Sequence, residues 1–255
     1  MNYEQYKKYN RLKFKESFSK TDVPSWNCPH CNKAPLSLIT DELKHSETLE
    51  SQARRSSPVW EPEQIEYLFS ATFFCPNCNC PTYCTGVGQH IFWRDPPFYE
   101  LNKDIIFTPK YFEPTLLLFT VPQKCPQSIS EILIASFAIA WIDLSSSGNK
   151  LRVAVEKIVA ELKPDLNKKM SLHHKIKNLE DSHPEISQLL LSIKWLGNNA
   201  SHDNSLLECD LVIGYLIMEN ILGYLYQSKS IDSNNLVEII NAYEGSPVQK
   251  INKEE

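Results

Sequence analysis

Two pairs of cysteines in the first half of the sequence have the residue types and spacing of a metal site. They are Cys28-Pro-His-Cys31 and Cys75-Pro-Asn-Cys78, each a Cys-Pro-x-Cys turn. A turn of this kind presents two thiolates to one cation, and two turns complete the tetrahedral four-sulfur shell that structural Zn²⁺ prefers. We therefore predict a structural zinc ion bound by these four thiols in a small zinc-ribbon-like β domain. The alternative is a set of reduced, buried cysteines without metal.

Neighbouring residues leave the ligand set open. Cys80 and Cys84 follow the second turn, and either could replace Cys78 or stand beside the site as an extra thiol. We expect His30, inside the first turn, to point outward. The chain begins Met-Asn-Tyr-Glu-Gln-Tyr-Lys-Lys, which has charges where a secretory signal would be apolar. We expect a cytoplasmic protein, whose eight cysteines stay reduced and favour metal over disulfides.

A second candidate site is a polar stripe on a helix predicted in the second half. Between residues 186 and 203 the apolar residues recur at helical spacing, whereas Lys194, Asn198 and His202 are four residues apart and share another stripe. The pKa range of an imidazole suits a general acid or base. Alternatively, His202 caps the end of its helix, where the helix dipole favours a cationic ring.

Arg152 and Glu156 accompany this stripe on a helix predicted near residues 149–162. They are four residues apart, next to the apolar face formed by Leu151, Val155 and Ile158. An Arg-Glu pair in that position is typical of an ion pair at the boundary of a core. The alternative is that both side chains support His202 across a helical bundle.

Charge and hydropathy restrict the partners. The net charge of −5 argues against nonspecific binding of duplex nucleic acid, which needs a basic face, although a small local patch remains compatible with it. The longest apolar stretch, Ile132 to Ile142, is too short to cross a bilayer, so we expect no membrane association. Residues 1–20 interleave basic and aromatic residues, which favours a docked amphipathic helix over a single-stranded nucleic-acid site.

The surrounding pattern predicts an α+β fold. Strands are expected over residues 65–74 and 82–93, a mobile hairpin or loop over 40–62, and a proline-marked linker from 96 to 126. Three Ser-x-x-Glu capping boxes, beginning at Ser128, Ser182 and Ser205, predict helices near 129–144, 184–202 and 206–226, with two more at 149–162 and 168–180. The expected domains are 1–122, a helical bundle over 123–230, and a short helix with a polar tail over 231–255.

The helical half resembles a known family. Leu151-Arg152-x-x-x-Glu156, the Leu172/Ile176 spacing and Ile193-Lys194-Trp195-Leu196-Gly197-Asn198-x-x-Ser201-His202 resemble the bacterial DUF4145 family, whose members often carry a Cys-x-x-Cys zinc-ribbon-like segment. That family looks like a branch of the HEPN superfamily, helical bundles that often form dimers and include RNases of toxin-antitoxin and phage-defence systems.

The resemblance implies a site made by an arginine, a polar residue and a histidine, with metal-independent cleavage of RNA through its 2′-hydroxyl. His202 matches the histidine and Asn198 the polar residue, but Gly197 occupies the arginine position and Lys194 is the nearest cation on the stripe. One hypothesis is a noncatalytic RNA-binding or protein-interaction subunit, as a homodimer or with a partner from a defence operon. The other is an endoribonuclease in which His202 is the acid or base, Asn198 positions the RNA, and Lys194 or Arg152 supplies charge across a dimer.

Overall fold

The computed structural model of the chain consists of two compact units. One comprises Lys15–Leu116, and the other comprises Leu117–Glu255 with Met1–Phe14. The structure describes residues 14–94, 101–167, 169–203 and 206–228, without the side chains of 93–94, 101–102, 195 and 197–203. The short helix predicted within residues 231–255 lies outside the described residues.

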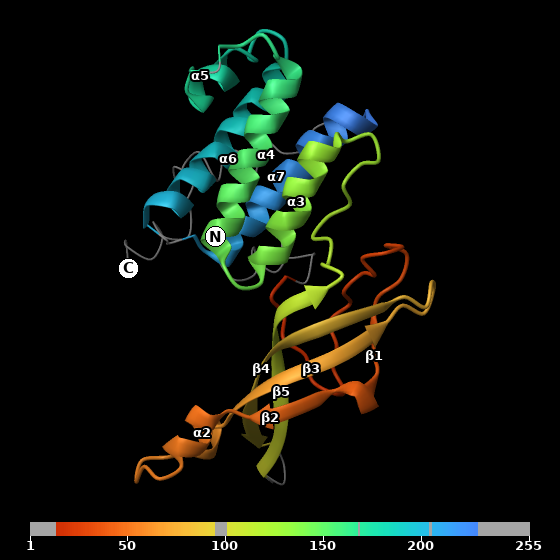
Figure 1. Ribbon diagram of the computed structural model, residues 1–255, viewed down its shortest axis with the longest axis vertical. Helices are drawn as coiled ribbons and strands as arrows, with labels where there is room; N and C mark the ends of the chain where they lie inside the picture. The colour runs from red at the N-terminus through yellow and green to blue at the C-terminus, as the bar shows by residue number, and fades with distance from the viewer. Residues whose placement is uncertain (1–13, 95–100, 168, 204–205, 229–255) are drawn as a thin grey trace. The chain divides into compact units, whose positions relative to one another are not determined.

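The first unit is built on a curled antiparallel sheet of five strands (Figure 1). The strands are β1 (Ser37–Leu38), β2 (Lys44–Glu47), β3 (Glu66–Phe74), β4 (Pro81–Arg94) and β5 (Leu101–Glu113). Their order is β1-β3-β4-β5, and β2 also pairs with β3. The strands predicted at 65–74 and 82–93 are thus confirmed as β3 and β4.

One face of this sheet forms the core of the unit. In β3 the buried residues Phe69, Ala71 and Phe73 alternate with more exposed ones, which is the period of a strand with one face in the core. Rings from distant parts of the chain join them: the Phe18 ring lies 5.5 Å from Phe69 and 5.4 Å from Phe107. Burial of these large rings contributes a large apolar area to the core of the sheet.

The proline-marked linker prediction is wrong for residues 101–113, which form β5. Proline is tolerated at edge strands and bulges because it lacks the N–H that a central strand needs. β5 pairs with β4 and lies at the end of the strand order, and Pro109 faces Gly86 where the register shifts between Thr85 and Gly86. The bulge therefore accommodates Pro109 within a strand, although the proline content of this segment predicted a linker.

Two other segments differ in part from their predictions. The 40–62 segment, predicted as a mobile hairpin or loop, contains β2, whose Lys44 faces Ser70 of the antiparallel strand β3, and a short helix α2 (Leu49–Arg54) capped by Thr48. Of the helix predicted in residues 1–20, residues 1–13 lie outside the described residues, and residues 14–20 are not helical. Instead, Phe18 exchanges two backbone hydrogen bonds with Phe107 of β5, because its ring is buried in the aromatic core.

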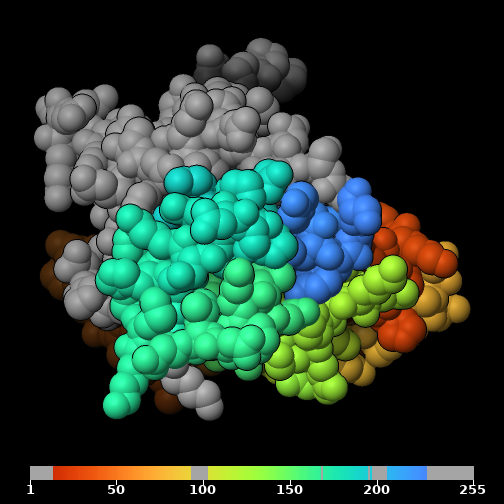
Figure 2. Space-filling view, turned by 90° about the horizontal axis from the view of Figure 1, so that it is seen from above, coloured from red at the N-terminus to blue at the C-terminus, as the bar shows by residue number. Residues whose placement is uncertain are grey.

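The second unit is helical, as predicted. Its helices are α3 (Gln127–Ala140), α4 (Leu144–Leu162), α5 (Leu172–Lys177), α6 (Pro184–Asp203) and α7 (Glu208–Gln227). α4 contacts each of the other four and is therefore the central element (Figure 1). Figure 2 looks onto the α5 end of this unit, where the green-to-cyan helices adjoin the blue end of α7.

The Ser-x-x-Glu boxes locate the helices but do not cap them. α3 begins after Pro126, which offers no side-chain cap, and α7 begins after Leu207, whose N–H donates to Asp210 Oδ2. α6 begins at Pro184, two residues after Ser182. A side-chain cap does occur at a helix without a Ser-x-x-Glu box: at the start of α4, Asp143 accepts a hydrogen bond from the Ser146 N–H.

By length and composition alone, α7 is apolar enough to cross a membrane. However, 72% of its apolar window is buried inside the structure, as in the core helix of a soluble protein. A hydrogen-bonded group helps to anchor it: the hydroxyl of the fully buried Tyr215 lies 2.9 Å from Ser136 Oγ and 2.6 Å from Ser147 Oγ. These bonds join α7 to α3 and α4, since a buried hydroxyl without a partner would be costly.

The bulge in the sheet yields a stability prediction. We expect Gly86→Ala to lower the free energy of unfolding by about 3 kcal/mol, because an added Cβ would collide with the Thr108 carbonyl oxygen and lie 2.8 Å from the Phe69 ring. Gly88→Ala is the control, because its nearest neighbour is the Phe107 ring at 3.1 Å, which can shift. Urea denaturation measures both; equal losses would contradict the packing at Gly86.

Candidate metal centre

Each cysteine pair lies at the tip of a hairpin. The first turn projects from a small hairpin in which the Leu36 N–H donates to the Trp26 carbonyl and the Cys28 N–H to the Ala34 carbonyl. The second turn joins β3 to β4, and there the Cys75 N–H donates to the Cys80 carbonyl. Both turns are therefore fixed at their bases by backbone hydrogen bonds.

The two turns share a conformation that the sequence analysis missed. The residue after each pair, Asn32 or Asn79, has a positive φ, of 50° and 57° respectively. Its N–H donates to the carbonyl of the first cysteine, at 2.9 Å for Cys28 and 2.8 Å for Cys75. Asparagine tolerates this left-handed conformation better than most residues. The repeated pattern Cys-Pro-x-Cys-Asn was the signal that could have revealed it.

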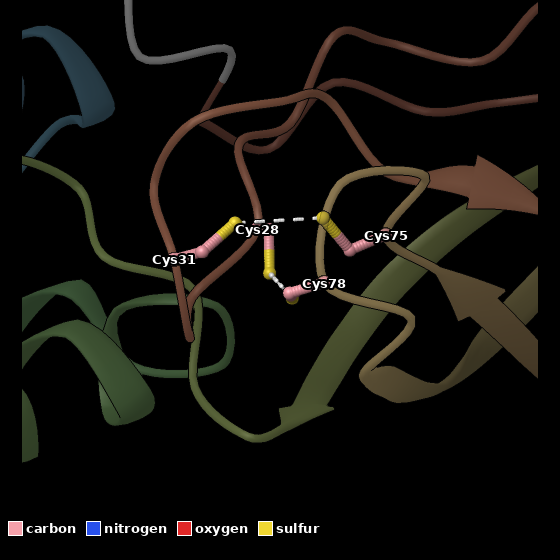
Figure 3. Close-up of side chains that lie close together, drawn as sticks. All are labelled: Cys28, Cys31, Cys75 and Cys78. Carbon is pink, nitrogen blue, oxygen red and sulfur yellow. Dashed lines mark hydrogen bonds between the residues drawn. The ribbon is translucent and has the colours of Figure 1, made fainter.

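The four thiols converge between the two tips (Figure 3). All four Sγ atoms lie within 4.8 Å of one another, with 3.7 Å between Cys28 and Cys78 and 3.5 Å between Cys31 and Cys75. These distances are too long for a disulfide bond. They fit a tetrahedral shell, since metal–sulfur bonds of ~2.3 Å place the sulfurs roughly 3.8 Å apart. The four predicted ligands are thus together and can hold a metal ion.

Backbone amides favour the thiolate form of these cysteines, whereas burial opposes it and raises the pKa of Cys28. Cys28 and Cys75 are buried, and Cys31 and Cys78 are half-buried. The Lys33 backbone N–H is the largest influence on Cys31 and lowers the pKa of that thiol to about 6. The Cys80 backbone N–H acts in the same direction on the pKa of Cys78, but burial and the neighbouring thiols raise that pKa overall. Such N–H donors stabilise the thiolate form that a metal requires.

The other candidate ligands lie outside the four-sulfur group. Cys84 is buried on the core face of β4 and belongs to neither metal-competent cluster among the described residues. Cys80 and the exposed His30 also stand outside the four-sulfur group. They nevertheless lie within 4.8 Å of Cys78 Sγ and of each other.

The candidate residues of the helical unit are only partly described. Arg152 and Glu156 form the ion pair expected of a boundary position, with 3.1 Å between Nη2 and Oε1 and side chains 32% and 43% exposed. They line a cavity of about 360 Å³ with residues from α5 and the loop before it: Met170, Ser171, Leu172 and Lys175. Lys194, on α6, is half-buried and its charge lowers the pKa of His173, after the larger effect of burial.

α6 runs to Asp203, so Asn198 and His202 belong to the same helix as Lys194. The side chains of Asn198 and His202 lie outside the described residues. Their predicted roles, and any support of His202 by Arg152 or Glu156, therefore stay predictions.

Fold and site together define a chain with a metal-competent antiparallel sheet unit and a separate helical unit. Residues 16–112 match the family model described as Domain of unknown function (DUF8608). Residues 135–249 match that of Domain of unknown function (DUF4145), which supports the resemblance found in the sequence. No curated protein and no solved structure matches the chain.

The metal centre predicts one tightly bound metal ion per chain. We expect Cys28→Ser or Cys75→Ser to abolish it and to lower the melting temperature, because each leaves three thiols and an open shell in a buried site. Elemental analysis of the purified protein measures the stoichiometry. Cys125→Ser is the matched control, since Cys125 is far along the chain and lies outside the cluster. A Cys75→Ser protein with undiminished metal would contradict this assignment.

The Arg152–Glu156 pair predicts a small effect on stability. We expect Glu156→Ala to lower the free energy of unfolding by no more than about 0.5 kcal/mol, because both side chains are partly exposed and the interaction is screened by water. Urea denaturation at low and high salt tests this. A loss of several kcal/mol, insensitive to salt, would instead indicate that the pair supports a buried network.

Proposed function

We propose that this chain is a zinc-binding, noncatalytic interaction subunit. A structural zinc ion holds its sheet unit, and its HEPN-like helical unit binds a partner protein or a second copy of the chain. The observation that carries the proposal is the convergence of four thiols from two hairpin tips. A shell filled entirely by protein ligands leaves no position for a substrate, which is the pattern of structural rather than catalytic zinc.

Zinc is the metal that best fits this shell. Four sulfurs in tetrahedral arrangement are typical of zinc and of iron bound by thiolates. The half-buried Cys31 and Cys78 leave an iron centre open to oxidation, whereas zinc has no redox chemistry. The metal analysis separates the two, since an iron centre would be coloured and zinc is not.

A protein partner suits the helical unit better than RNA. The chain carries a net charge of −5, and Glu156 offsets the charge of Arg152 within the ion pair. A polyanion gains affinity chiefly from unpaired basic side chains, so both features weaken binding to RNA. The resemblance to HEPN proteins would place such a module in a bacterial defence or nucleic-acid-processing system.

The alternative is a metal-independent endoribonuclease that uses His202 and Asn198 across a dimer. One observation favours it: α6 is continuous from Pro184 to Asp203, so Lys194, Asn198 and His202 are spaced by four along a single helix. The weakness of this alternative is that the expected arginine is missing. Cleavage builds negative charge at the scissile phosphate, and residue 197 is glycine where the resemblance implies arginine.

An RNA-degradation assay distinguishes the two functions. We expect the purified wild-type protein, with no divalent metal added to the buffer, to leave single-stranded RNA intact, and His202→Ala to behave identically, because residue 197 is glycine where the resemblance implies the arginine that would stabilise the transition state. His174→Ala, the same change at an exposed histidine of α5, is the matched control. Cleavage by the wild type that disappears in His202→Ala would overturn the noncatalytic proposal and establish the endoribonuclease.

A further inference from the structure

The two cysteine turns are near repeats, and the residues that break the repeat lie together. The third position is His30 in the first turn and Asn77 in the second, and the sixth is Lys33 in the first and Cys80 in the second. Asn77 Nδ2 lies 3.5 Å from Cys31 Sγ, so the third residue of one turn stands beside the second cysteine of the other. The corresponding place on the other side is occupied by His30, next to Cys78.

Three side chains on this side of the metal centre carry donor atoms that suit zinc. A His30 ring nitrogen, Cys78 Sγ and Cys80 Sγ all lie within 4.8 Å of one another. Donors around one zinc ion are separated by roughly 3.5 to 3.8 Å, so small side-chain rotations would bring all three to one cation. His30 is exposed, and Cys78 and Cys80 are half-buried, so an ion can reach them from solvent.

We propose that His30, Cys78 and Cys80 form a second metal site, in which Cys78 Sγ bridges the new ion to the four-cysteine centre. The site takes a second zinc ion or another soft divalent cation, and it rests on the proposed zinc centre because it shares Cys78 with it. One nitrogen and two sulfurs leave a fourth position for water or an exogenous ligand. This site is therefore open, whereas the four-cysteine centre is closed.

Charge favours the second ion. One Zn²⁺ with four thiolates carries a net charge of −2, and Cys80 as a ligating thiolate brings it to −3. A second divalent cation at the shared thiolate reduces this to −1, so it relieves repulsion among five clustered sulfurs. The second ion has three ligands and shares one of them, so it binds more weakly than the first.

The test is a zinc titration of the metal-free full-length protein against a chromophoric chelator. Wild type is expected to take up two equivalents in two steps, whereas His30→Ala and Cys80→Ser are expected to lose the weaker step and retain the tighter one. Cys84→Ala is the matched control: it removes a nearby thiol outside both clusters and is expected to keep both steps.

Each outcome bears on one site or the other. A wild type with a single tight equivalent would overturn the second site and leave the four-cysteine centre intact. Retention of two steps in Cys80→Ser would also overturn it. A wild type without any tight equivalent would instead refute the zinc centre of the proposed function, so the two failures are distinguishable.

Discussion

The constraint on which the sheet unit depends is that two hairpin tips, far apart in the sequence, must bring four sulfur atoms to one point. The hairpin bases achieve this through the aromatic core. Trp26, two residues before Cys28, packs its ring 5.8 Å from Phe73 and 5.2 Å from Phe112. Phe73 itself is two residues before Cys75, so the same ring contacts fix the roots of both turns. A metal ion held by these thiols would bind a shape that core packing has largely formed, which would limit the conformational entropy lost on binding.

The helical unit is organised by a different interaction, a buried polar one. Ser136, Ser147 and Tyr215 come from three helices and satisfy one another in an interior where an unpaired hydroxyl would cost free energy. Apolar packing alone would allow α7, which is apolar on nearly all sides, to rotate about its axis. A hydrogen-bonded group at one point on its surface selects one orientation, because other rotations leave hydroxyls without partners.

The features predictable from the sequence were those that local spacing determines. Cys-Pro-x-Cys turns, the β-branched and aromatic residues of β3 and the helical periodicity of α4 and α6 each express one local geometry, and the structure bears them out. The errors came from partners distant in sequence. Pro109 predicts the end of a strand unless the bulge opposite Gly86 is known. β2 forms a strand because β3 offers an unpaired edge. The Ser-x-x-Glu boxes failed because sequence alone does not say which polar residue reaches the first free N–H.

The charge arrangement in the helical unit bears on whether any chemistry takes place there. Arg152 is the residue whose guanidinium could assist a phosphodiester, but its Nη2 is held 3.1 Å from Glu156. To help at a phosphate it must leave that carboxylate or share its charge with it, and a carboxylate beside the RNA would repel the backbone. Lys194 raises the local positive charge near His173, yet a flexible ammonium lacks the fixed fork with which arginine holds two phosphate oxygens. These charges are the physical argument behind the proposal that the helical unit recognises a partner and does not cleave RNA.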